Sequence, residues 1–506
     1  MPLSPSSAKR WLILFAVMLA FLPVVIDMTI LHIAIPPLTL ALGASGTEVL
    51  WIIDIYPLLM AGLLVPMGTL ADRIGNRRIL LTGLLVFGIA SLLAAFAPSP
   101  AMLIGARVLL ALGGSMIMPC VLGIIRRTFE DERERAMALG LWGTVGAAGA
   151  AVGPLIGGML LEHFWWGSVF LINVPVVLVV VLSAFVLLPR REITTPGGWA
   201  FGQALVLIAG IIALVYGIKT GVAGTQPLVL TLWILAFGLL LLTLFVRLQL
   251  RAESPMLDLS LFSHPAILAG MIMALVACGA LAGVELTLAQ ELQYVLDKTP
   301  LQAGIFMIPI MAAAAIGGPC AGHLTHLFGL RLVASLSLAL SALVLALLAN
   351  ADFHHPGLWV PALLGMLGLA LSIGLTASSI AIMGSVDASK GGAAGSLEAT
   401  GYELGSGLGI TFFGVFMSSV FGRTLELPAS LAQPLATQAS RSIGDAHVVA
   451  RQLDAQQAGA VIEAAKAAFS TTHSVLLTTS AVLIGLLAVA VFFMLAGHAP
   501  RDMSPA

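Results

Sequence analysis

The sequence predicts an all-α polytopic membrane protein with fourteen transmembrane helices. Of its 506 residues, 59% are hydrophobic and only 9% are charged, and the mean hydropathy is +1.06. A soluble protein would carry roughly 25% charged residues. Apolar stretches of about 20 residues, the length that a helix needs to cross the hydrocarbon core, recur along the chain. Composition and pattern together exclude a soluble globular fold.

The apolar stretches follow one another from the N-terminus to the C-terminus. The first six cover residues 11–36, 47–67, 79–97, 101–125, 136–161 and 168–188. The other eight cover residues 199–217, 227–244, 266–287, 301–321, 332–349, 358–383, 393–421 and 475–496. Lys9 and Arg10 precede the first stretch as they would in a signal peptide. That stretch is too long and lacks a small-residue cleavage site, so we interpret it as the first span.

Basic residues predict the orientation, because Lys and Arg collect in short cytoplasmic loops. If the N-terminus is cytoplasmic, the inner loops and tails hold sixteen Lys and Arg residues, whereas the short outer loops hold only Lys219 and Lys298. The sixteen are Lys9, Arg10, Arg73, Arg77, Arg78, Arg126, Arg127, Arg133, Arg135, Arg190, Arg191, Arg247, Arg251, Arg331, Lys390 and Arg501. We therefore expect both termini in the cytoplasm.

Two repeated patterns predict an internal duplication. GTLADRIGNRRI, which starts at Gly68, has a weaker copy in GHLTHLFGLRLV, which starts at Gly322, 254 residues later. Two glycine stripes lie 252 residues apart: Gly149, Gly153 and Gly157, and Gly401, Gly405 and Gly409. The agreement of the two offsets predicts two homologous six-helix halves. We assign residues 1–190 and 261–506 to the halves, and residues 191–260 to two inserted central helices.

The repeated segment GTLADRIGNRR forms a tight turn between two spans, and its glycines allow close backbone approach. An ordinary basic loop is the plain interpretation. The string resembles the signature motif of the major facilitator superfamily, in which this loop latches the two halves and sets the inward to outward equilibrium. The resemblance implies a conformational latch made by Gly68, Asp72, Arg73, Gly75 and Arg77. The second copy has His326 in place of Asp72, so we expect an asymmetric latch.

The fifth stretch contains GPLIGG. Small residues four apart let two helices touch closely, and a proline adds a bend. The plain interpretation is a packing face formed by Gly149, Gly153, Pro154, Gly157 and Gly158. The GPxxGG pattern also resembles a motif of the exporters in the superfamily, which implies efflux rather than uptake.

The first stretch contains DMTILHIAIP, which starts at Asp27 and resembles the first-span motif of the fourteen-span drug/proton antiporter family. His32 stands where relatives often have asparagine. Arg107, followed by Gly113 and Gly114, occupies the place of that family's fourth-span arginine. LGASGTEVLWIIDIY, WGSVFLINVPVVLVV and AQELQ resemble the quaternary ammonium efflux group within the family.

This resemblance covers essentially the whole chain. It implies the major facilitator fold and a multi-pass location in the inner membrane of a bacterium. It also implies proton-coupled export, by alternating access, of lipophilic mono- and dicationic compounds such as quaternary ammonium biocides, dyes and methyl viologen.

Apart from Glu48 at the very start of the second stretch, six charged residues fall within the predicted spans: Asp27, Asp54, Arg107, Glu285, Glu398 and Glu403. A charge in hydrocarbon costs at least about 2.5 kcal/mol on insertion scales, so these side chains should face the protein interior or a cavity. At a rise of about 1.5 Å per residue, the first four lie in the outer half and the last two nearer the cytoplasm. Carboxylates that line a cavity attract cations and exchange them for protons. We assign proton coupling or substrate binding to this set and to Tyr402, which shares a face with Glu398.

The residues of the outer group also have structural interpretations. Arg107 can hold Asp27 permanently, because intramembrane charges often pair. Asp54 lies at a span end and can be interfacial. Glu285 lies one turn beyond the position that the offset of 254 assigns to Asp27. It can be the second half's counterpart, or it can be solvated near the outer boundary.

The two acids of the thirteenth span point about 140° apart around one helix, so we expect only one of them to line the path. Glu398 matches the acidic thirteenth span of the antiporter family, and we favour it. A structural ion pair is the alternative for Glu403.

The sequence contains no nucleotide-binding loop, metal-binding spacing or hydrolase motif, so we expect no cofactor, no metal and no enzymatic activity. Cys120, Cys278 and Cys320 all fall in apolar stretches and show no CxxC spacing. A gradient must therefore drive transport. Each charge that crosses 100 mV is worth about 2.3 kcal/mol, so a dication needs two entering protons to avoid working against the potential. This requirement favours two exchanging carboxylates, Asp27 and Glu398.

Several alternatives stay open at this point. A facilitator or importer of a small cationic metabolite would share the fold, and a non-transport membrane scaffold is a second alternative. The net charge of −1 and the absence of a basic tail argue against a nucleic-acid partner, and we expect a monomer in the lipid bilayer. Residues 422–473 form either a helical hairpin over the outer mouth or a tolerated loop.

Overall fold

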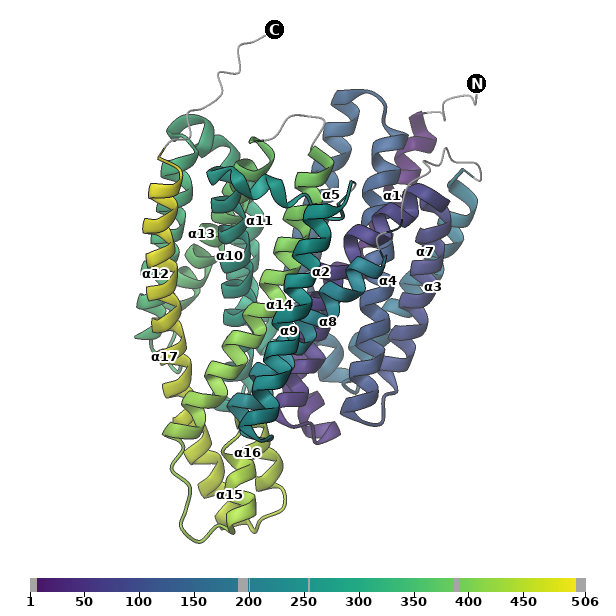
Figure 1. Ribbon diagram of the computed structural model, residues 1–506. Helices are drawn as coiled ribbons and strands as arrows, with labels where there is room; N and C mark the ends of the chain where they lie inside the picture. The colour runs from purple at the N-terminus through teal and green to yellow at the C-terminus, as the bar shows by residue number, and fades with distance from the viewer. Residues whose placement is uncertain (1–6, 190–198, 200, 254, 386–390, 497–506) are drawn as a thin grey trace.

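The computed structural model describes residues 7–189, 199, 201–253, 255–385 and 391–496, and the regular secondary structure in these residues is all helical (Figure 1). In these parts, fourteen segments are long and apolar enough to cross a membrane. The predicted all-α polytopic fold is therefore confirmed. The basic residues Arg190, Arg191, Lys390 and Arg501, and the proposed domain boundary at residue 190, lie outside the described residues.

The spans have the following bounds. The first six are formed by α1 (Ser7–Leu42), α2 (Gly46–Ile74), α3 (Asn76–Ala95), α4 (Pro100–Thr128), α5 (Glu132–His163), and α6 (Ser168–Leu171) with α7 (Asn173–Leu187). The inserted pair is α8 (Phe201–Ala223) and α9 (Leu228–Arg251). The other six are α10 (Pro265–Gln290) with the π-helical turn η2 (Glu291–Val295), α11 (Pro300–Phe328), α12 (Leu330–Ala349), α13 (Trp359–Met383), α14 (Gly391–Thr424) and α17 (Ala455–Met494). Three short helices complete the described part: η1 (Leu259–Ser263), α15 (Gln433–Ala439) and α16 (Ile443–Ala450).

The internal repeat is visible in the helix bounds. Both ends of α2 and of α3 recur 254 residues later in α11 and α12. Each first helix begins with a capping box, Ser45 with Glu48 in α2 and Thr299 with Gln302 in α11, which satisfies amide groups that the helix start leaves free. Each pair is joined by a single glycine with positive φ, Gly75 at 105° and Gly329 at 81°. Only glycine adopts such angles without strain, so the turn chemistry was duplicated with the helices.

The apolar core forms three clusters. One draws its side chains mainly from α1 to α7, and a second mainly from α10 to α17. The third surrounds α8 and includes side chains of α2, η1, α10, α13 and α14. The inserted helix α8 therefore packs against helices of both halves, whereas α9 presents most of its apolar side chains outward.

Both α15 and α16 lie at one end of the bundle, which we call the cap end, and α1 begins and α17 ends at the opposite end (Figure 1). The last helix begins at Ala455, twenty residues before the predicted span, because a polar first part continues into the apolar part without a break. The structure shows the helical alternative for residues 422–473, and the position of this segment over the outer mouth stays a prediction. Helices α15 and α16 form a cap, and α16 packs against α1 and α17.

The two halves are in close contact at the cap end. The Gln293 side-chain amide donates to the Ile33 carbonyl at 3.0 Å, and the Thr299 hydroxyl donates to Glu162 at 3.3 Å. Pro154 on α5 lies against Gly304 on α11 so closely that a Cβ at Gly304 would stand 2.6 Å from the Pro154 carbonyl oxygen. Contacts of this kind close the cap end of the bundle.

Candidate functional site

Asp27 on α1 and Arg107 on α4 form a buried ion pair. The Arg107 Nε also donates to the Ile52 carbonyl of α2 at 2.9 Å, and its guanidinium lies 4.6 Å from the centre of the Tyr56 ring. One arginine thus joins α1, α2 and α4. Asp27 Oδ1 is buried without a hydrogen-bond partner among the described residues. In this conformation Arg107 is paired with Asp27, as the structural interpretation of Asp27 predicts. The second oxygen of the Asp27 carboxylate takes no part in that pair.

Glu285 on α10 is buried rather than solvated, and its nearest ionisable partner is His32 on α1. The His32 Nε2 and a Glu285 carboxylate oxygen are 3.8 Å apart. The contact joins the two halves, because α1 belongs to the first and α10 to the second. The solvated interpretation of Glu285 is therefore wrong, and His32 belongs to the site.

Asp54 on α2 is fully buried inside the protein. Its Oδ2 lies 2.6 Å from the Lys219 Nζ of α8 and accepts a hydrogen bond from Thr411 of α14 at 2.7 Å. The expectation that Lys219 lies in an outer loop is wrong. Helix α8 continues to Ala223, so Lys219 lies inside the helix with an exposed fraction of only 2%.

The two acids of α14 have different surroundings. The half-buried Glu398 accepts a hydrogen bond of 2.6 Å from the Tyr402 hydroxyl, which also lies 3.3 Å from the Leu375 carbonyl of α13. Glu403 is 5% exposed, and its Oε2 has no hydrogen-bond partner among the described residues. Glu403 and Asp27 both interact electrostatically with the Tyr56 hydroxyl, so Glu403 lies toward the first half.

The signature loop lies at the end of the bundle opposite the cap. Asp72 pairs with Arg127 of α4 at 3.3 Å, and Arg77 donates to the Phe185 carbonyl of α7 at 3.0 Å. Gly68 packs near Pro119 of α4, Gly75 forms the turn, and Arg73 is exposed. These contacts all stay within the first half. A latch between the halves remains a prediction for another conformation.

The glycine face of α5 makes two contacts. Gly149, Gly153 and Gly157 lie against α1, and a Cβ at Gly157 would stand 2.6 Å from the Ile30 side chain. Gly158 faces α11, where a Cβ would stand 2.7 Å from the Leu301 Cα. The second stripe repeats the first contact, because Gly405 and Gly409 of α14 lie against α10. The small residues therefore allow close approach both within and between the halves.

The cap is fastened to the first half by hydrogen bonds. Asp445 of α16 accepts from the Gly46 amide at the start of α2 at 2.9 Å and from the Ser442 hydroxyl at 2.7 Å. Arg451 donates to the Leu40 carbonyl near the end of α1 at 3.0 Å. Burial raises the pKa of Asp445 above its usual range and lowers the pKa of His447.

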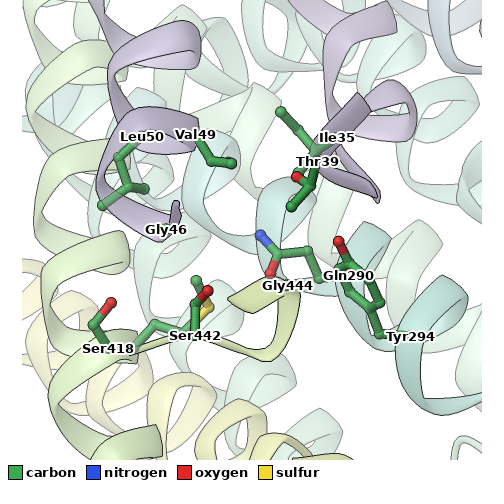
Figure 2. Close-up of a pocket in the computed structure, with 11 residues that line it drawn as sticks. Ile35, Thr39, Gly46, Val49, Leu50, Gln290, Tyr294, Ser418, Ser442 and Gly444 are labelled. Atoms are coloured by element: carbon green, nitrogen blue, oxygen red, sulfur yellow. The ribbon is translucent and has the colours of Figure 1, made fainter. Parts of the chain in front are cut away.

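A small pocket lies beneath this cap, between α1, α2, the end of α10, η2, α14 and α16. Figure 2 shows Ser418 and Ser442 on one side and Gln290 and Tyr294 on the other. Hydroxyl, amide and apolar groups line the pocket, and no charged side chain does. The pocket lies where the two halves and the cap meet.

A sequence model described as Major Facilitator Superfamily matches residues 17–284. The chain belongs to the major facilitator superfamily. It is 48% identical over 492 residues to the methyl viologen resistance protein SmvA of Salmonella typhimurium, which covers 96% of this chain and 99% of SmvA. It is 34% identical to the multidrug efflux pump LfrA of Mycolicibacterium smegmatis, over 92% of each chain.

Solved structures of the same fold are much less similar in sequence. A bacterial homologue of the human lysosomal transporter Spinster, in an inward-facing and unoccupied conformation, superposes with a TM-score of 0.69 at 17% identity. The match covers 97% of this chain and 98% of that one. These findings establish the predicted major facilitator fold and make this superfamily member a multi-pass membrane transporter related to resistance and efflux proteins.

Sequence reasoning missed Lys219 and the His32–Glu285 contact. A single Lys two residues beyond a predicted span could have been included in that span, since Tyr216 and Lys219 continue the helical pattern. The partner of Lys219 is 165 residues away in the chain, and no local signal indicates it.

Proposed function

We propose that this protein exports lipophilic mono- and dicationic compounds from the bacterial cytoplasm in exchange for protons. It spans the inner membrane with both termini in the cytoplasm, and the cap faces outward. The observation that carries the proposal is the fully buried Asp27, whose Oδ1 has no hydrogen-bond partner in the part of the chain that the structure describes. The names of SmvA and LfrA, a methyl viologen resistance protein and a multidrug efflux pump, support the substrate class.

The protonation state of Asp27 controls its contact with Arg107, and through Arg107 the packing of α1 against α2 and α4. A guanidinium stays protonated at all physiological pH values, so the state of the Asp27 carboxyl decides whether the link between α1 and α4 is an ion pair. A proton or a substrate cation that binds Asp27 competes with Arg107. Because Arg107 is also bonded to the Ile52 carbonyl, its release changes how α1 sits against α2 and α4.

The second exchanging carboxylate lies on α14. Glu398 is half-buried and bonded to Tyr402, so it is the more accessible of the two acids. Glu403 lies deeper and toward Asp27. We assign proton exchange to Asp27 and Glu398, and Glu403 is the alternative to Glu398. Two such groups supply the two protons that export of a dication requires.

Alternating access requires the closed cap end to open. Opening breaks the Gln293–Ile33 and Thr299–Glu162 hydrogen bonds between the halves and releases the cap from α2. The signature loop then changes partners and latches the opposite end. This opening would expose the pocket that lies beneath the cap.

The test is uptake of labelled methyl viologen into everted membrane vesicles under an imposed pH gradient. We expect wild-type vesicles to accumulate the dication only with the gradient, and Asp27→Asn and Glu398→Gln to abolish accumulation. Asp352→Asn, which changes an exposed acid outside the site, should behave as wild type. A facilitator would instead equilibrate methyl viologen without a gradient, and full accumulation by Asp27→Asn would refute the role of that residue.

A further inference from the structure

The inserted helix α8 carries a buried ammonium group that the transport steps above do not use. The Lys219 Nζ lies 2.6 Å from Asp54 Oδ2 and 3.8 Å from the centre of the Trp51 ring. Asp54 interacts with Lys219 on α8 and with Thr411 on α14. Both members of the ion pair are buried, so each is the compensating charge that the other needs.

Three parts of the molecule meet at this ion pair. Asp54 belongs to α2 of the first half, Thr411 to α14 of the second half, and Lys219 to the insert. Helix α2 also touches α14 on either side of Asp54, where Leu50 lies against Gly414 and Leu58 against Gly407. Rocking of the halves about a central site separates contacts of this kind.

The contacts between α8 and α2 differ from those that cross between the halves. Just before α8 begins, the chain is fastened to α2, because the Trp199 indole donates to the Pro66 carbonyl at 3.2 Å. Midway along the helix, Ile208 fills the space beside Gly62. Lys219 adds the third contact near the cap end. Helix α8 is thus attached to α2 along its length.

The two contacts of Asp54, with Thr411 and with Lys219, also differ in how much it costs to break them. Loss of the Thr411 hydrogen bond leaves an ion pair intact, and the hydroxyl proton then has another acceptor in the Gly407 carbonyl of its own helix, 3.1 Å away. Rupture of the Lys219–Asp54 ion pair leaves two buried charges unpaired, which is strongly unfavourable. When the halves separate, the bond to Thr411 is therefore the one that breaks.

We propose that Lys219 is the resident counter-ion of Asp54 and that this pair clamps the inserted helix α8 to the first half, so that α8 moves with α2 during transport. Lys219 is a positioning residue in this account. Asp54 keeps its charge throughout the cycle, which removes it from the predicted set of proton-exchange residues. The clamp itself does not depend on the proposed function, whereas its part in movement rests on that function.

The clamp can be tested by thermal unfolding of the purified protein. Lys219→Met should lower the Tm markedly, and Lys219→Met combined with Asp54→Asn should recover most of the loss, because no buried charge is then unpaired. Lys466→Met is the matched control, since Lys466 pairs with the exposed Asp297 at 2.5 Å. If Lys219→Met lowers the Tm no more than Lys466→Met, or if the double variant recovers nothing, the clamp is refuted.

The movement can be tested with disulfides in a variant that lacks the three native cysteines. A Cβ at Gly62 would stand 3.7 Å from the Ile208 Cβ, a separation that suits a disulfide. Oxidised Gly62→Cys/Ile208→Cys protein should transport methyl viologen as well as the reduced protein. Oxidised Gly46→Cys/Ser442→Cys protein, in which the disulfide would join α2 to the cap, should lose transport and regain it on reduction.

Loss of transport on oxidation of the Gly62–Ile208 pair would show that α8 moves against α2 and would overturn the proposal. If the reduced parent protein does not transport, the proposed function fails while the unfolding test of the clamp still stands.

The pH profile of transport gives a third readout. Lys219→Arg should keep the wild-type profile. Lys219→Met should change it, because Asp54 without a counter-ion takes up a proton. An unchanged profile in Lys219→Met would contradict the role of Lys219 as counter-ion.

Discussion

Gly158→Ala should open the cap end of the bundle. The added Cβ would stand 2.7 Å from the Leu301 Cα and 2.8 Å from the Pro300 carbonyl oxygen, whereas ordinary contact begins at 3.4 Å. Helices α5 and α11 must therefore separate locally by about 0.7 Å, and both obstructing atoms belong to backbone that cannot rotate away. Overpacking of this kind costs about 1 to 3 kcal/mol.

The cost falls on the conformation in which the cap end is closed, because α5 and α11 belong to different halves. A difference of about 1 to 3 kcal/mol shifts a two-state equilibrium about 5- to 150-fold. The assay is double electron–electron resonance between spin labels at the exposed Pro98 and Asp352, which follow the cap ends of α3 in the first half and α12 in the second. Gly365→Ala is the matched control, since its Cβ would meet its nearest neighbour at 3.6 Å.

We expect Gly158→Ala to raise the population of the long distance and Gly365→Ala to leave the distribution unchanged. An unchanged distribution in Gly158→Ala, with the protein folded, would refute the inference that close α5–α11 contact maintains the closed state.

Three further predictions follow from the site and the cap. Arg107→Met should destabilise the protein by about 3 to 5 kcal/mol, because it leaves the buried Asp27 charge unpaired. Adding Asp27→Asn should restore the stability measured by thermal unfolding but should not restore transport, and restored transport would contradict the account. Gly75→Ala should cost about 1 to 2 kcal/mol, because φ is 105° there; Gly105→Ala, with no atom within 4 Å of its Cβ, should leave the Tm nearly unchanged, and equal Tm values would argue against strain. Burial lowers the pKa of His447 below its usual 6.5, so the docked cap holds fewer protons than the released cap, and docking weakens as pH falls through that value. Hydrogen exchange of the α16 amides, corrected for intrinsic rates, should therefore become faster as pH falls from about 7 to about 5. The variant His447→Gln should not show this change.

Asp445 contributes to the pH dependence of the cap with the opposite sign. Its pKa is raised mainly by burial, so the docked cap holds its proton more tightly than the released cap does. This contribution is fully present below the usual value of 3.8 and is lost as pH rises through the raised pKa. The comparison of wild type with His447→Gln separates the histidine contribution from that of Asp445.

The sequence was sufficient for the architecture because each span must satisfy its own backbone within an apolar stretch, and such stretches are visible without tertiary information. The duplication was also visible without tertiary information, because Gly75 and Gly329 stand at the same place in two similar segments, between one span and the next. The site was only partly accessible. Asp27 and Arg107 stood out as costly charges in apolar surroundings, and their pairing was one of two alternatives.

What the sequence could not supply depends on contacts between distant segments. Lys219 looked like a loop residue because hydropathy falls at the first charge, although pairing with Asp54 lets the helix continue past it. The helical pattern of the cap was visible, but its docking depends on Asp445 reaching the Gly46 amide, 399 residues away. Specific pairings of this kind are set by the packed fold rather than by local pattern.

The most direct test of the central claim is proton release on substrate binding. Methyl viologen is added to the purified protein in weakly buffered detergent solution, and the pH is followed with an indicator dye. If binding of the dication displaces protons from Asp27 and Glu398, the wild-type protein releases protons and the Asp27→Asn/Glu398→Gln variant releases none. Binding of methyl viologen to wild-type protein without proton release, across the pH range in which transport operates, would contradict proton-coupled exchange at these carboxylates.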